Sequence, residues 1–370
     1  MSTSQMPLDD AANLSVEEIA TVTGEHLALT ADAGGSGITL QPNLTCYCRG
    51  TLIRTVAGNA PIEDLRIGDC VLTASGEARP IRWLGSRGVD CIRHPHPALV
   101  WPIRIQAGAF GQDQPVRDLW VSPFHSILVE GVLIQAQALL NNATIAQVPR
   151  EQVEYWHLEL DSHDILLAEG LPGESYLDVG NRTAFINGGA FVEAYPDFRP
   201  KHWTETCVPV ATSGAAVQSA KAVLLARAEA LGYVMTEDPD VHVIADGERI
   251  EPVRLGKQRL TFMLPAAGAT IELRCRSFIP AHFDPASDDQ RSLGICVDRV
   301  QFDGAEIALD NEEAFALGWH ALEVNPEGRS WRWSRDRAPL PVGTRLVVID
   351  IAGPGRYWAE PTSTVIALAG

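Results

Sequence analysis

Cys46 stands out chemically because a cysteine thiol can attack the peptide bond that precedes it. It lies in the stretch TCYCRGT, residues 45–51, just before a Gly-Thr turn. Attack on the Thr45 carbonyl would produce a thioester and release the amide nitrogen of Cys46. That nitrogen must be protonated as it leaves. The chemistry therefore requires a proton donor from a distant part of the chain.

Ser122 and His125 are candidates for this role. They are three residues apart in VSPFHSI, at the end of an expected strand. Across a Pro-containing turn, a hydroxyl and an imidazole at this spacing can face one peptide group, so that the hydroxyl orients the amide and the imidazole protonates its nitrogen. His163 and Asp164, in LDSHDILLAEG, are auxiliary candidates for the opposite wall of the site, where a structural role is favoured.

A buried structural role is the competing interpretation. Cysteine is among the residue types most often buried, so Cys46 on its own would be a core residue. For Cys48, Cys70 and Cys91 we expect burial as small apolar side chains. His125 on its own would be an ordinary core or surface histidine, so its assignment depends on the combination of motifs.

A zinc site is a second alternative, because thiolates and imidazoles are the ligands that zinc prefers. Neither group of candidates has Cys-x-x-Cys spacing, and the prolines of HPHP are typical of an exposed loop. No metal is therefore expected. The residues considered are Cys46, Cys48, Cys91, His94 and His96.

Between residue 46 and about residue 189 the sequence predicts an all-β domain. Its apolar runs are short and are interrupted by Gly, Pro, Asn and Asp. Examples are TLIRTV, CVLTA, IRWLG, PIRIQAG and LWVSPFHSILVEG. Because no helical segment connects these runs, we expect antiparallel sheets.

Residues 1–45 are expected to form a weakly structured leader. Ser15 and Glu18 make a capping box for one short helix, and an extended segment leads to Cys46. Residues 190–206 are expected to link the first domain to a second.

The sequence of residues 207–370 predicts a β-sandwich-like domain with one leading helix. The helix is expected in AVQSAKAVLLARAEALGYV, which is rich in helix-forming residues and ends near Gly232. Apolar runs joined by Asp-Gly turns follow.

Composition excludes several classes of protein. The net charge of −18, from 47 acidic and 29 basic residues, repels phosphate backbones, so nucleic acid is not an expected partner. No apolar run is long enough to span a bilayer. The first residues lack the basic start and apolar core of a classical signal peptide, so the expected location is the cytoplasm, or outside the cell after export by another route. Seven scattered cysteines predict mainly reduced thiols.

Four motifs in order resemble the Hint (hedgehog/intein) domain, in particular its bacterial Hint-like type. They are the opening CYCRGT, EDLRIGD ending in Gly68-Asp69, VSPFHSI and HDILLAEG. Ser122 and His125 occupy the place of the family's Thr-x-x-His, and the serine keeps the hydroxyl but lacks the methyl group. The resemblance covers residues 46 to 189.

The resemblance implies a flattened, horseshoe-like all-β fold whose first residue performs an N-to-S acyl shift. By this resemblance, Cys46 is the nucleophile, His125 is the general acid at the Thr45-Cys46 bond, and Ser122 is its orienting partner. Asp69 is an auxiliary candidate, expected to bind turn amides. No cofactor is implied.

The sequence departs from the family's motifs in ways that exclude some of the family's reactions. Inteins end in His-Asn followed by Cys, Ser or Thr, whereas no His here precedes Asn, and Asn181 and Asn187 precede Arg and Gly. Hedgehog proteins carry an Asp for sterol attack shortly after the strand that IRWLG resembles, and GSR at 85–87 occupies that place. We therefore expect a single-turnover cysteine-dependent autoprotease. Its own N-terminal peptide is the substrate, and water or a small nucleophile resolves the thioester.

A processing-inactive scaffold is the alternative function. The second half resembles β-sandwich modules that accompany bacterial Hint-like domains. In its sequence, aromatic residues occur among charged ones. Such residues either fill a sandwich core or bind a glycan or protein ligand. They are Trp319, Trp331, Trp333, Tyr357 and Trp358.

Overall fold

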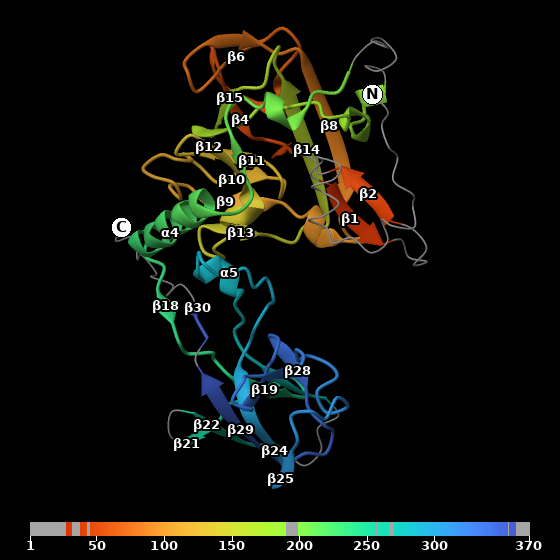
Figure 1. Cartoon of the computed structure of the whole chain (residues 1–370), viewed down its shortest axis with the longest axis vertical. Helices are drawn as coiled ribbons and strands as arrows, with labels where there is room; N and C mark the ends of the chain where they lie inside the picture. Colours follow the sequence, from red (N-terminus) through yellow and green to blue (C-terminus); the bar gives the residue numbers. More distant parts are fainter. Residues whose placement is uncertain are drawn as a thin grey trace, which may run out of the picture. The chain divides into compact units, whose positions relative to one another are not determined.

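The computed structural model describes most of the chain after residue 26 (Figure 1). The described ranges are 27–31, 38–42, 45–189, 199–255, 258–265, 270–353 and 355–359. By their internal contacts the residues divide into an N-terminal unit, Met1–Ala220, and a C-terminal unit, Lys221–Gly370. Each unit is described by itself.

The first sheet of the N-terminal unit has six antiparallel strands in the order β13-β9-β10-β3-β14-β8. Its longest pair, β8 and β14, runs side by side over eight residues each (Figure 1). The short strand β3 lies between β10 and β14. The strands are β3 (Tyr47–Cys48), β8 (Trp83–Asp90), β9 (Ile103–Ile105), β10 (Leu119–Val121), β13 (Ile145–Gln147) and β14 (Gln152–Glu159).

The second sheet follows the order β17-β12-β11-β16-β15-β4-β6-β7, and β5 pairs with β4. Only β17 is parallel to its neighbour, β12. The strands are β4 (Leu52–Thr55), β5 (Gly58–Pro61), β6 (Cys70–Leu72), β7 (Ala78–Pro80), β11 (Ser126–Val129), β12 (Val132–Gln135), β15 (Ile165–Ala168), β16 (Leu171–Glu174) and β17 (Val210–Ala211).

Shorter elements complete the N-terminal unit. An antiparallel hairpin, β1 (Leu27–Ala31) and β2 (Ile38–Pro42), lies in the expected leader. The short helix expected near Ser15 lies outside the described residues. Single 3₁₀ turns are η1 (Ile62–Asp64), η2 (Pro97–Leu99), η3 (Ala136–Leu139), η4 (Arg182–Ala184) and η5 (Trp203–Glu205).

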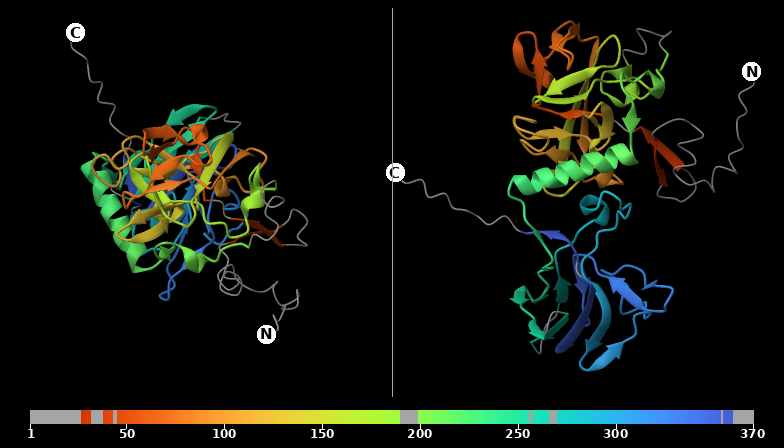
Figure 2. Two further views of the ribbon diagram at one scale, coloured as in Figure 1. Left: turned by 90° about the horizontal axis from the view of Figure 1, so that it is seen from above. Right: turned by 60° about the vertical axis from the view of Figure 1, so that its left-hand side comes forward.

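The C-terminal unit contains a four-stranded sheet, β20-β19-β23-β28, and a seven-stranded sheet, β21-β22-β29-β24-β27-β26 with β25 on β24 (Figure 2). Val243 and Leu273 of the first sheet share one buried cluster with Phe262, Val300 and Val347 of the second, as in a sandwich. The strands are β18 (Met235–Thr236), β19 (His242–Ala245), β20 (Glu248–Ile250), β21 (Val253–Leu255), β22 (Arg259–Met263), β23 (Ile271–Arg274), β24 (Cys296–Phe302), β25 (Ala305–Ile307), β26 (Glu323–Val324), β27 (Ser330–Trp333), β28 (Arg337–Pro339), β29 (Leu346–Gly353) and β30 (Tyr357–Trp358).

One long helix, α4 (Ala215–Ala230), spans the boundary between the units. It ends where expected, because Gly232 adopts a positive φ of 94° and its amide donates to Glu229 O. A further short helix is the single turn α5 (Pro280–Phe283). None of the described helices combines the length and hydropathy needed to cross a membrane.

The expectation of a mainly β chain with one leading helix in its second half is confirmed. The Asp-Gly turns form as predicted, since Asp246 and Asp303 each adopt a positive φ before a positive-φ glycine. All seven cysteines are free thiols. The domain limits at 45, 189 and 206 stay predictions.

Candidate functional site

The short strand β3 positions the Thr45-Cys46 bond between two longer strands. Tyr47 is in register with Val121 of β10 and with Trp156 of β14. Continuing both antiparallel registers by one residue brings Ser122 and His157 beside Cys46. The site therefore forms where three segments distant in sequence meet.

Ser122 binds both backbone polar groups of Cys46, its N–H and its carbonyl. The Cys46 N–H donates to Ser122 Oγ at 2.8 Å, and the Ser122 N–H donates to Cys46 O at 2.9 Å. The hydroxyl thus lies at hydrogen-bond distance from the nitrogen that would leave in an acyl shift. After attack, the same hydroxyl can rotate to donate to this nitrogen.

His125 follows in a tight turn in which its N–H donates to Ser122 O at 3.1 Å. The imidazole is fully buried, and neither ring nitrogen has a hydrogen-bond partner among the described residues. Its ring lies 4.1 Å from the Tyr47 ring. Gly173 permits this packing, because a Cβ there would lie 3.1 Å from His125 Nε2 and 2.6 Å from Tyr47 Oη.

Burial governs the charge state of the site. Desolvation lowers the pKa of His125 to about 4, although Glu174 opposes the shift. Desolvation also raises the pKa of the Cys46 thiol well above its usual value, and Cys48 adds to this effect. At neutral pH both groups are uncharged. A proton must therefore move within the site when the thiol attacks.

His157 is a further site residue, which sequence reasoning missed. Its Nε2 lies 3.1 Å from Thr45 Oγ1, and its Nδ1 accepts the N–H of Leu158 at 3.1 Å. This second bond assigns the ring proton to Nε2, which donates to Thr45. Burial lowers the pKa of His157 well below its usual value. The imidazole thus fixes the residue whose carbonyl would be attacked.

Comparison with known proteins identifies a family for the segment that contains this site. The family model of the Hint domain matches residues 45–180, beginning at the residue before Cys46. Residues 45–180 are a Hint domain. Hint domains are self-processing domains, so the match supports an intramolecular self-processing capacity in general.

Solved structures similar to this chain include inteins. A variant of the gp41-1 intein is 12% identical, with 35% of this chain and 98% of that chain covered and a TM-score of 0.27. The MchDnaB-1 intein is 13% identical, over 35% and 99%, with a TM-score of 0.27. A bacterial intein-like domain from Clostridium thermocellum is 14% identical, over 36% and 99%, with a TM-score of 0.26. No curated protein matches this chain.

The auxiliary candidates have other contacts in the Hint domain. Asp69 is exposed and accepts the Arg66 N–H at 2.8 Å within its turn. Asp164 pairs with Arg79 at 2.7 Å. His163 is buried, and its ring contacts Cys207 rather than the Cys46 amide.

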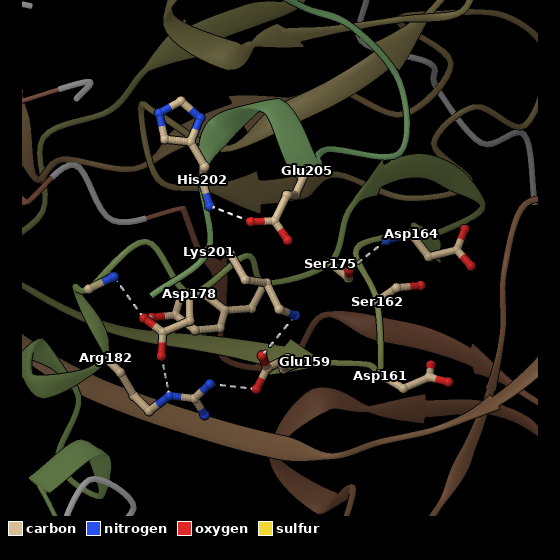
Figure 3. Close-up of polar contacts among 12 residues, drawn as sticks. Glu159, Asp161, Ser162, Asp164, Ser175, Asp178, Arg182, Lys201, His202 and Glu205 are labelled. Atoms are coloured by element: carbon tan, nitrogen blue, oxygen red, sulfur yellow. Dashed lines mark hydrogen bonds and ion pairs between the residues drawn. The ribbon is translucent and has the colours of Figure 1, made fainter. Parts of the chain in front are cut away.

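A buried arginine, also missed from the sequence, ties the end of the Hint domain to β14. Arg182 donates to Asp178 at 2.5 Å and to Glu159, the last residue of β14, at 2.6 Å (Figure 3). Lys201 also reaches Glu159. The guanidinium lies 4.5 Å from the Trp83 ring centroid. Because His157 lies two residues before Glu159, this network holds the strand that carries it.

The zinc alternative has no support in the geometry. Cys46 and Cys91 pack in an apolar cluster with Trp83, whereas His94 is half-buried and its Nδ1 lies 2.8 Å from the carbonyl oxygen of exposed His96. Among the described residues no group of three or more His, Cys, Asp or Glu side chains could hold a metal ion.

Most of the aromatic candidates of the C-terminal unit are packed inside it. Trp319 and Tyr357 are buried, and Trp358 packs on Phe283 with 5.6 Å between ring centroids. Trp331 and Trp333, by contrast, line a cavity of about 500 Å³.

Removing Arg182 should destabilise the N-terminal unit. In Arg182→Ala, buried Asp178 loses its cationic partner and buried Glu159 is left with Lys201 at 3.4 Å, which costs about 3–5 kcal/mol of unfolding free energy. Urea unfolding followed by hydrogen exchange at β14 amides measures this loss. Arg49→Ala is the control, because Arg49 forms a solvent-exposed ion pair with Glu154. Its loss should leave the midpoint of urea unfolding unchanged. Equal effects of the two substitutions would contradict a stabilising role of the buried network.

His125 should remain neutral in the folded protein down to about pH 4. In the unfolded chain the His125 ring takes up a proton near pH 6.5. The free energy of unfolding therefore falls by about 3 kcal/mol as the pH is lowered from 6.5 to 4. NMR of the His125 ring carbons across this range gives the midpoint directly. A midpoint near 6.5 in the folded protein would show that the imidazole is hydrated instead of buried.

Proposed function

We propose that the Hint domain cleaves its own chain before Cys46 through a thioester, without splicing. The observation that carries the proposal is the 2.8 Å hydrogen bond between the Cys46 amide and Ser122 Oγ. The buried imidazole of His125 supports it, because its ring lies 4.1 Å from the ring of Tyr47, the residue after Cys46. Buried polar groups are nearly always hydrogen-bonded, so a buried imidazole with no hydrogen-bond partner among the described residues calls for a role. A role in moving a proton to the leaving nitrogen satisfies that requirement.

The reaction begins with attack of Cys46 Sγ on the Thr45 carbonyl carbon. The thiol proton passes to neutral His125, which then protonates the Cys46 nitrogen while Ser122 orients it. The carbon–nitrogen bond breaks, leaving Thr45 joined to Sγ as a thioester and Cys46 with a free amino group. Water then attacks the thioester, restores the thiol and releases residues 1–45 with a carboxylate on Thr45.

Hydrolysis is favoured over splicing or sterol transfer by what the chain lacks. No His precedes Asn anywhere in the sequence, so the cyclising terminus of an intein is missing. Asn181, moreover, accepts the Tyr176 hydroxyl at 2.6 Å in the buried interior. Residues 85–87 of β8 contain no acid for activating a sterol.

Purified full-length protein should release residues 1–45 in a time course followed by intact mass. Cys46→Ala abolishes release because the nucleophile is gone. His125→Ala slows it by about 10²–10⁴-fold, the usual loss of a general acid. Ser122→Thr retains activity, whereas Ser122→Ala slows release. Dithiothreitol accelerates release by attacking the thioester.

Cys48→Ala is the matched control, since this thiol lies two residues after Cys46, in β3, and is not part of the scissile Thr45-Cys46 bond. It should leave the rate of release unchanged. A chain that stays intact with and without dithiothreitol would contradict the proposal and favour an inactive Hint scaffold.

The inactive scaffold is the second candidate function, with the C-terminal unit as a glycan-binding module. The cavity lined by Trp331 and Trp333 favours it, because half-buried aromatic faces beside charged groups suit sugar rings. Glu323 accepts the Trp331 Nε1–H at 3.2 Å and pairs with Arg291 at 2.8 Å. These two bonds hold one indole in place at the cavity wall.

A glycan array probed with the full-length protein tests this second candidate. Trp331→Ala should weaken binding of a retained glycan roughly tenfold or more, as expected for an aromatic anchor. Trp120→Ala is the control, because Trp120 is a half-buried indole of the N-terminal unit that stacks on Arg150. Binding that is absent, or that both variants weaken equally, would argue against the cavity as a glycan site.

A further inference from the structure

Cys207 differs from the other six cysteines because it is the one exposed thiol. The others are buried or half-buried. Cys46 and Cys48 in particular are protonated at neutral pH, since burial raises the pKa of both thiols, that of Cys48 to about 12. Reagents in solution therefore reach Cys207 first.

A buried histidine contacts this exposed thiol. Cys207 Sγ lies 3.3 Å from His163 Nδ1, and the backbone N–H of Cys207 donates to the same nitrogen at 3.2 Å. The second bond makes Nδ1 an acceptor, so the proton of the neutral ring lies on Nε2. Nδ1 can then take the thiol proton, as a general base does.

A buried carboxylate faces the other ring nitrogen. Glu174 Oε2 lies 3.7 Å from His163 Nε2, and both side chains are almost completely buried. Glu174 Oε1 accepts the Ser126 N–H at 2.6 Å, which fixes the carboxylate. Thiol, imidazole and carboxylate follow one another as nucleophile, base and orienting group.

The surroundings of His163 favour a proton on its ring. Burial alone would lower the pKa of His163, but the contacts with Cys207 and Glu174 raise it to about 9. A ring held next to Glu174 in this way is suited to accept the proton of the neighbouring thiol.

We propose that Cys207, His163 and Glu174 form a reactive thiol site, open to solvent, that exchanges with low-molecular-weight disulfides. The Cys207 proton moves to His163 Nδ1, and the thiolate attacks one sulfur of a disulfide RS–SR. A bond from Cys207 Sγ to that sulfur forms while the original S–S bond breaks. The other half leaves as a thiolate and takes up a proton from water. The product is a mixed disulfide on Cys207.

The test uses the full-length Cys46→Ala protein, so that its outcome does not depend on self-processing. Oxidised glutathione is the probe, and mass spectrometry of the digested protein gives the rate at each cysteine. Cys207 should react at least about tenfold faster than the half-buried Cys70 at neutral pH. His163→Asn should remove this advantage. Glu174→Gln, whose amide oxygen can still accept the Ser126 N–H, should slow the reaction several-fold.

Circular dichroism checks that the variants fold, and alkylation by iodoacetamide at neutral pH provides an independent readout. The rate at Cys207 should exceed the rate at Cys70 in the parent protein, and His163→Asn should lower it. A rate at Cys207 that never exceeds the rate at Cys70 overturns the proposal. A folded His163→Asn variant that reacts as fast as its parent also overturns it.

Discussion

The two-residue strand β3 is the constraint on which the candidate site depends. It is paired on one side with β10 and on the other with β14, so both registers act on the Thr45-Cys46 bond. One neighbour provides Ser122 at the amide nitrogen, and the other provides His157 at the Thr45 hydroxyl. The turn that follows β3 requires Gly50, which has a φ of 83°. A register slip on either side would turn Ser122 or His157 to the opposite face of the sheet.

Burial gives this site its chemical character. A buried thiol and a buried imidazole are both uncharged at neutral pH, so neither is reactive toward solvent. Their chemistry is restricted to groups that the fold brings together, as a reaction on the protein's own backbone requires. Cys207 has the opposite arrangement, because this residue is exposed while His163 and Glu174 beside it are buried. The proposed reactions of the two thiols follow this difference, one within the chain and one with a reagent in solution.

The sequence predicts those parts of the structure that local chemistry determines. Short apolar runs broken by turn residues predict the β architecture, Asp246-Gly247 predicts a hairpin turn, and Gly232 predicts the end of α4. Cys46, Ser122 and His125 were predicted as site residues because their motifs are compact, and their roles stay predictions. His157, Arg182 and Cys207 were not found, because each acts through a partner that is remote in sequence. His157 is 112 residues from Thr45, and Cys207 is 44 residues from His163. Only strand register and the packing of the chain after β16 bring these pairs together.

The central claim is that the Thr45-Cys46 bond passes through a thioester, and trapping that thioester tests it most directly. Hydroxylamine attacks thioesters far faster than peptide bonds, so the full-length protein should yield residues 1–45 ending in a hydroxamate on Thr45. Cys46→Ala protein treated in the same way should yield none. Mass spectrometry of the released fragment identifies its terminal group. A chain that remains intact in hydroxylamine, or a fragment that also forms from Cys46→Ala, would contradict the account.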